Sequence, residues 1–158
     1  MRLMMFAILA PGLLLSACSK APTTNEFLTK AIRGDNSEMR LGTLAATKGG
    51  PAVAAYGHTL EADHSKAREA AIALAGHYGI TPPSDILPAA EDEERKLEKL
   101  GGIDFDKEFT RYMVKDHEED IADFKKEAES DAPADVRRLA LSALPDLQKH
   151  LDMAKGLK

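Results

Sequence analysis

Five ionisable residues stand at positions where a helical repeat would turn them toward a shared interior. They are Glu38, His64, His117, Asp120 and His150. At 100° per residue, each lies on, or in the case of Asp120 beside, a helical face of apolar or small side chains. His117, for example, shares its face with Met113, Ile121 and Phe124. Imidazole and carboxylate groups that project inward from facing helices are the usual ligands of metal sites in helical bundles.

Distances from the chain turns place these residues at similar heights. Glu38 lies thirteen residues before Pro51 and His64 thirteen residues after it, which is roughly 20 Å along each helix. The other three fall within about one turn of the middle of their own helices. We therefore expect all five to meet near mid-bundle. His58 and His77 fall on the opposite face from His64 and are expected at the surface.

Two interpretations of this cluster follow from the cost of burying charge, which is several kcal/mol per unpaired group. In the first, the cluster binds a divalent transition metal, and its histidines favour zinc, iron or copper over Mg²⁺ or Ca²⁺. Because a histidine must be neutral to bind metal, affinity should then weaken below the ordinary histidine pKa of about 6.5. In the second, a metal-free network of histidine and carboxylate groups supports a module that binds a protein partner or a cell-wall component.

Other catalytic or binding motifs are missing from the sequence. No phosphate-binding loop and no arrangement of a nucleophile with histidine is visible, so the sequence leans away from an enzyme without deciding the question. Metal buffering, stress protection and redox chemistry at the cluster stay open as roles. The formal net charge of −5 argues against binding to nucleic acid, which requires a basic surface. A protein partner cannot be named from the sequence.

Helix start and stop signals predict the elements that position the cluster. Four long helices are expected at residues 25–48, 51–78, 104–130 and 133–155, with a short one at 91–100. Gly-Gly-Pro at 49–51 and Asp-Ala-Pro at 131–133 mark tight turns, which make antiparallel neighbours. The long connection between the second and third long helices favours a ferritin-like crossover, and an up-down-up-down bundle is the alternative.

Length and composition agree with a single helical domain. The chain has 158 residues, of which 44% are hydrophobic and only 5% aromatic, and it contains no tryptophan. Such a composition favours closely packed helices over a β-sandwich. We assign the helical domain to residues 25–158, after a signal peptide at 1–17 and a tether at 18–24.

The N-terminus predicts export and lipid anchoring. A positive start and a short apolar stretch end in Leu15-Ser16-Ala17-Cys18, which resembles the lipobox of bacterial lipoproteins. The resemblance implies cleavage before Cys18 and acylation of this residue, the only cysteine in the sequence. Ser19 rather than aspartate follows, which favours a periplasm-facing position on the outer membrane. The alternative is an ordinary secretory signal followed by an incidental cysteine.

Several stretches together resemble a known family. They are EMRLGTLAA from Glu38, DHS from Asp63, FD from Phe105, MVKDHEED from Met113 and LPDLQKHL from Leu144. In this order they resemble the bacterial exported family called domain of unknown function 4142, over roughly residues 25–154. The resemblance implies a ferritin-like four-helix bundle in exported or envelope proteins and no established activity. The ferritin di-iron set of four carboxylates and two histidines is not reproduced.

Overall fold

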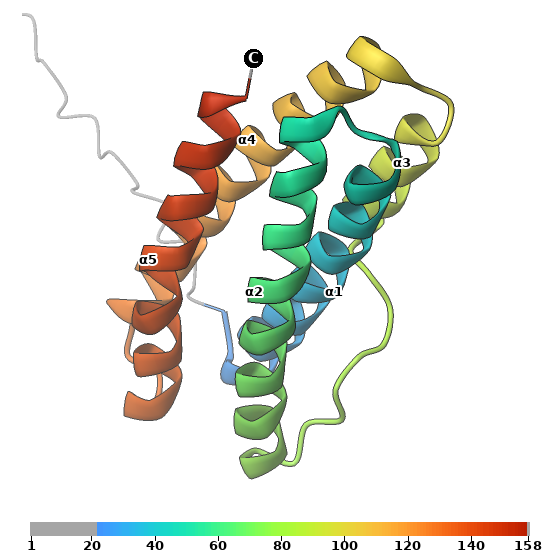
Figure 1. The fold of residues 1–158 in the computed structure, drawn as a ribbon. Helices are drawn as coiled ribbons and strands as arrows, with labels where there is room; N and C mark the ends of the chain where they lie inside the picture. Colours follow the sequence, from blue (N-terminus) through green and yellow to red (C-terminus); the bar gives the residue numbers. More distant parts are fainter. Residues whose placement is uncertain (1–21, 158) are drawn as a thin grey trace, which may run out of the picture.

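The computed structural model describes residues 22–157, which form five α-helices and no strand (Figure 1). The helices are α1 (Thr24–Lys48), α2 (Pro51–His77), α3 (Pro88–Leu97), α4 (Gly102–Ala128) and α5 (Ala134–Gly156). The predicted all-α class is thus confirmed. The predicted signal peptide and Cys18 lie outside the described residues. No helix within residues 22–157 is long and apolar enough to cross a membrane.

Helix ends differ from the predicted ones by two or three residues at most, for local reasons. The N-cap of α1 is Thr23, because its hydroxyl accepts from the Glu26 amide while its own amide donates to the Glu26 carboxylate at 2.7 Å. The short helix α3 begins at Pro88 and not at residue 91. Proline suits this first-turn position, since its fixed φ is helical and no amide hydrogen is lost there.

The order of the long helices is that of the ferritin-like crossover. The amide of Gly50, in the turn between α1 and α2, donates to the Asp106 carboxylate near the start of α4 at 2.9 Å. At the other end of the bundle, the Tyr78 hydroxyl after α2 donates to Asp135 at the start of α5 at 2.7 Å. Helices α2 and α4 therefore run in the same direction, and residues 78–101 carry the chain back along the bundle (Figure 1). The up-down-up-down alternative is wrong.

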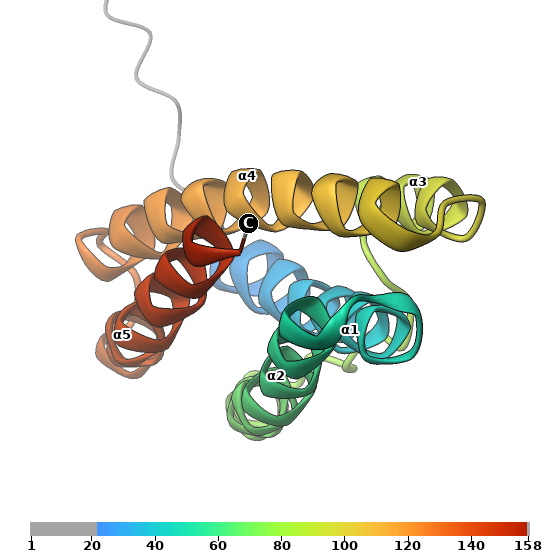
Figure 2. The same cartoon turned by 45° about the horizontal axis from the view of Figure 1, so that its top comes forward.

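The bundle consists of two antiparallel hairpins, α1 with α2 and α4 with α5, and α3 lies beside the start of α4 (Figure 2). The first hairpin is unusually close. A Cβ atom placed on Gly57 would lie 2.5 Å from the carbonyl oxygen of Gly42 and 2.8 Å from the amide of Ala46. Small residues on α1 and α2 thus allow the two helix backbones to approach closely.

The two larger apolar clusters of the described residues lie on either side of a polar layer in the interior. One surrounds Tyr56, Leu60 and Phe109, and the other surrounds Ile32 and Val136. Glu38, His64, His117 and His150 each fall, along their helices, between the positions that supply these two clusters, whereas the buried Glu127 lies at the end of α4. The polar layer is therefore held in a rigid apolar frame near the middle of the bundle.

Candidate metal centre

Three histidines from three different helices meet in the polar layer. His64 comes from α2, His117 from α4 and His150 from α5, with exposed fractions of 5%, 0% and 1%. The ring centroids of His64 and His150 are 5.1 Å apart, those of His117 and His150 5.5 Å, and those of His64 and His117 6.0 Å. One nitrogen from each ring lies within 4.8 Å of one from each of the other two. We call these three residues the histidine triad.

Hydrogen bonds fix the tautomers of two of the rings. Nδ1 of His117 donates to the carbonyl oxygen of Met113 at 2.9 Å, because a carbonyl can only accept. Nε2 of His150 lies 3.2 Å from Oδ2 of Asp63. The ammonium of Lys149 lies 2.8 Å from the same oxygen, and together with His150 it keeps the pKa of Asp63 below its usual range. Asp63 is therefore ionised, and Nε2 of His150 is the donor.

The third ring contacts a carboxyl group on α1. Nδ1 of His64 lies 2.9 Å from Oδ1 of Asp35. Burial lowers the pKa of His64 to about 3 and raises that of Asp35 to about 8, since both charged forms lose their hydration. At neutral pH the imidazole is therefore neutral, with one ring proton, and the carboxyl group of Asp35 is protonated. When the ring proton is on Nδ1 and donates to Oδ1 of Asp35, Nε2 of His64 carries a free lone pair.

The remaining nitrogen of each ring has no hydrogen-bond partner within residues 22–157. These atoms are Nε2 of His64, Nε2 of His117 and Nδ1 of His150, and all three are buried. These nitrogens therefore have no partner among the described residues, and a buried polar atom left without one costs free energy. Metal-binding histidines typically combine one free nitrogen with a second nitrogen bonded to a carboxylate or a backbone carbonyl. The triad has this pattern at all three rings.

Carboxyl groups from α1 and α4 form a second group beside the triad. Glu38, Asp116 and His117 each offer an atom within 4.8 Å of the others, and Glu38 is 1% exposed. Burial raises the pKa of Glu38 to about 7 and that of Asp116 to about 8. Asp120 belongs to neither group, although burial also raises its pKa to about 7. The layer therefore holds several carboxyl protons at neutral pH.

Burial also lowers the pH at which protons compete with a metal ion for the nitrogens of the triad. The pKa of His150 falls to about 4 and that of His117 is lowered as well, in both cases mainly through lost hydration. The triad therefore stays neutral well below pH 6.5. The sequence predicted that metal affinity weakens below the ordinary histidine pKa of about 6.5. With the lowered pKa values, the pH of this change is lower than predicted.

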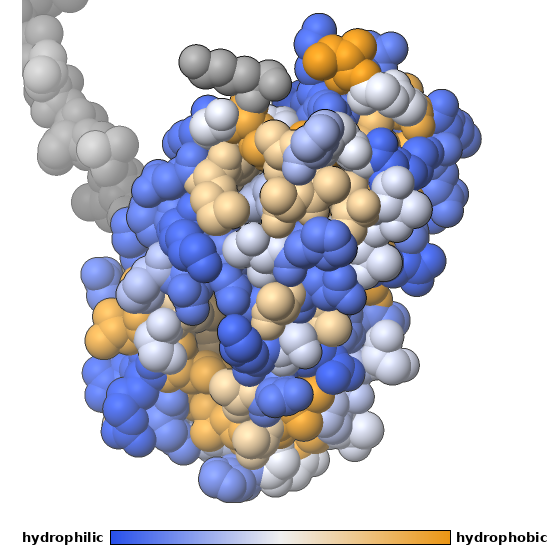
Figure 3. Space-filling view, viewed as in Figure 1, coloured by the Kyte–Doolittle hydropathy of each residue, from blue (hydrophilic) through white to orange (hydrophobic). Residues whose placement is uncertain are grey.

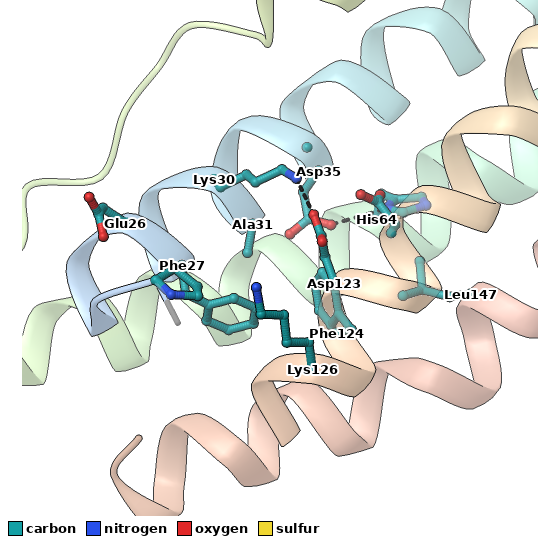
Figure 4. Close-up of a pocket in the computed structure, with 13 residues that line it drawn as sticks. Glu26, Phe27, Lys30, Ala31, Asp35, His64, Asp123, Phe124, Lys126 and Leu147 are labelled. Atoms are coloured by element: carbon teal, nitrogen blue, oxygen red, sulfur yellow. Dashed lines mark hydrogen bonds and ion pairs between the residues drawn. The ribbon is translucent and has the colours of Figure 1, made fainter. Parts of the chain in front are cut away.

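Two cavities lead from the surface to His64. One, of 390 Å³, lies between α2 and α5 and is bordered by His64, His150 and Asp63. Figure 3 shows apolar side chains gathered between the lower halves of these two helices. The other, of 200 Å³, opens near Lys30 and Asp123, with His64 and its partner Asp35 at its inner end (Figure 4). Small ions and water thus have routes toward the triad.

The five residues singled out from the sequence lie in one region of the structure. His64, His117 and His150 meet, and Glu38 belongs to a second group that shares His117 with the triad. Asp120 lies close enough to both His117 and Asp116 to interact with their charges. His58 and His77 are exposed, as predicted.

Sequence reasoning missed three carboxyl residues of this layer, namely Asp35, Asp63 and Asp116. The repeated Asp-His dipeptide at 63–64 and 116–117 was the available signal for two of them. Asp35 stands one helical turn before Glu38, and only its contact with His64 on the neighbouring helix shows its role.

Comparison with known sequences decides the family. The sequence profile of the domain of unknown function DUF4142 matches residues 14–157. The chain belongs to this family. The resemblance predicted from its motifs is thereby confirmed, and the match covers all the residues of the polar layer. No curated protein matches the DUF4142 chain in sequence.

A solved structure supports the fold of this DUF4142 protein. The chain is similar to a DUF305 fragment from Deinococcus radiodurans, with a TM-score of 0.74 and 18% sequence identity. The similarity covers 85% of this chain and 94% of the fragment. At this identity the likeness concerns the helical fold alone.

Proposed function

We propose that this DUF4142 protein binds one divalent transition metal ion through Nε2 of His64, Nε2 of His117 and Nδ1 of His150. The observation that supports this most strongly is the presence of three buried, converging rings, each with one nitrogen bonded outward and one left without a partner. The three rings lie within 4.8 Å of one another through one nitrogen each, close enough for a single ion to reach all three. A metal ion satisfies all three at once.

The surroundings of the triad also favour a metal ion. Asp35 and Asp63 hold the outer nitrogens of two rings and orient them, and the ionised Asp63 also raises the basicity of His150. Three protein ligands leave at least one coordination position for water or another small ligand. The two cavities that end at His64 give an ion a way in. Imidazole ligands favour zinc, copper or iron.

Electron paramagnetic resonance of the Cu²⁺-loaded protein tests this ligand set. The wild type should bind one tightly held Cu²⁺ per chain, with hyperfine structure from nitrogen ligands. His150→Ala should change that spectrum, whereas His58→Ala should not. A wild-type spectrum identical to that of Cu²⁺ in buffer would favour the alternative, a metal-free module with a hydrogen-bonded histidine network.

We further propose that the protein works in the bacterial cell envelope, anchored by acyl chains on Cys18 and facing the periplasm, most consistently at the outer membrane. The lipobox-like sequence supports this, and two or more acyl chains give stable membrane attachment. An envelope protein with a buried metal site suits metal handling or protection from metal stress.

Replacement of Cys18 by serine should separate the protein from the membrane anchor. We expect Cys18→Ser to lose incorporation of labelled fatty acid and to keep its signal peptide, because the acyl acceptor is the cysteine sulfur. Metabolic labelling followed by gel analysis measures both effects. Equal labelling of the variant and the wild type would refute the lipoprotein assignment without affecting the metal proposal.

A further inference from the structure

The carboxyl group of Glu38 is buried without a positively charged partner, and the Asp116 carboxyl is the group close enough to share a proton with it. Glu38 is 1% exposed, and neither of its oxygens has a hydrogen-bond partner within residues 22–157. An ionised carboxylate in such a place normally accepts several hydrogen bonds or binds a cation. The side chain is therefore either protonated or ready to bind a positive ion.

The neighbours of Glu38 do not supply positive charge. Nδ1 of His117 is 3.7 Å from Oε1 of Glu38, but this nitrogen already donates to the backbone of Met113 and the ring is neutral. Asp116 adds a second carboxyl group. Two carboxylates can hydrogen-bond to each other only if one holds a proton. Lys30, on the same helix as Glu38, is bonded to Asp123 at the surface.

We infer that Glu38 and Asp116 form a second cation site, next to the histidine triad and distinct from it, that takes a harder, oxygen-preferring divalent ion such as Mn²⁺ or Fe²⁺. Two carboxylates with water completing the coordination shell are a common arrangement for such ions. The triad ligands are nitrogens, so the two sites differ in chemistry. His117 lies within reach of both groups and places the sites side by side.

The two-site arrangement differs from a single site made of all five predicted residues. It assigns Glu38 to a second ion together with Asp116 from α4, and both residues lie close to His117. The inference does not depend on a metal in the triad, because the ligands of the second site are different residues. An experiment can therefore test each site without the other.

Mn²⁺ is the probe, since free Mn²⁺ gives a strong paramagnetic resonance signal that weakens on binding. The protein is first loaded with one equivalent of Zn²⁺, which prefers the nitrogen ligands, and Mn²⁺ is then titrated. We expect one Mn²⁺ per chain in the wild type. Glu38→Gln and Asp116→Asn should each weaken Mn²⁺ binding at least tenfold. Asp152→Asn, which changes an exposed carboxylate on α5, should leave it unchanged.

Further variants distinguish failure of this site from failure of the triad. His64→Ala should lose the Zn²⁺ and keep the Mn²⁺. Circular dichroism melting of the Gln and Asn variants verifies that they are folded, and both replacements keep the side-chain size. The inference is overturned if the wild type leaves all Mn²⁺ free. Equal Mn²⁺ binding by folded Glu38→Gln and wild-type protein also overturns it, because the ion then sits on surface carboxylates.

Discussion

Zn²⁺ or Cu²⁺ should raise the melting temperature of the protein by about 10 °C when the free metal is at about a hundred times its dissociation constant. This excess stabilises the folded state by about 2.7 kcal/mol, because the assembled triad exists only in the folded protein. For a domain of this size, 1 kcal/mol corresponds to roughly 3 to 5 °C. His64→Ala and His117→Ala should remove the whole gain, since either change leaves only two imidazole ligands.

His58→Ala and His77→Ala are the matched controls for this experiment. Both histidines lie on α2 with His64 but are exposed, so the gain should remain in full. Differential scanning fluorimetry with and without metal measures all five proteins. A metal-free network predicts another pattern, in which the inward changes lower the melting temperature equally with and without metal. No metal-induced shift in the wild type would contradict the metal proposal.

The second large effect concerns pH. Unfolding free energy of the metal-free protein should fall as pH rises from about 6.5 to 8. The carboxyls of Asp35 and Asp116 have folded pKa values of about 8, and those of Glu38 and Asp120 of about 7. In the unfolded chain all four ionise near pH 4. The folded state therefore holds more protons, and stability falls as these protons are lost.

The size of this effect follows from proton linkage. Each proton held only by the folded state changes the unfolding free energy by about 1.4 kcal/mol per pH unit. The pKa values of about 8 and 7 leave the folded state with roughly three excess protons at pH 6.5 and roughly one at pH 8, which gives a loss of roughly 4 to 5 kcal/mol. The triad does not oppose the loss, because its lowered histidine pKa values reduce stability only below about pH 6.5.

Urea unfolding at several pH values measures the linkage. Glu38→Gln should flatten the slope above pH 6.5, since it removes one of the buried protons, whereas Asp152→Asn should keep it. Bound metal should reduce the slope as well, because its charge favours the ionised carboxylates. A stability that is constant or rises between pH 6.5 and 8 in metal-free protein would show that these carboxyls are already ionised.

Local sequence signals determined the helices and the inward direction of the key residues. Gly-Gly-Pro at 49–51 ends one helix and begins the next through backbone effects that need no tertiary context. The 3.6-residue repeat turned His64, His117 and His150 toward the apolar side, and the structure buries all three. The family was also readable, since its motifs lie in continuous stretches.

Tertiary structure alone decided which side chains of the polar layer hydrogen-bond to one another. A helical wheel gives the direction of a side chain but not the rotation and offset of the neighbouring helix, and shifts of a few ångströms decide which groups bond. Asp63 thus bonds to His150 of α5 and Asp35 to His64 of α2, which leaves one nitrogen free on each of these rings. The same packing sets Glu38 beside Asp116, because both are turned toward the contact between α1 and α4.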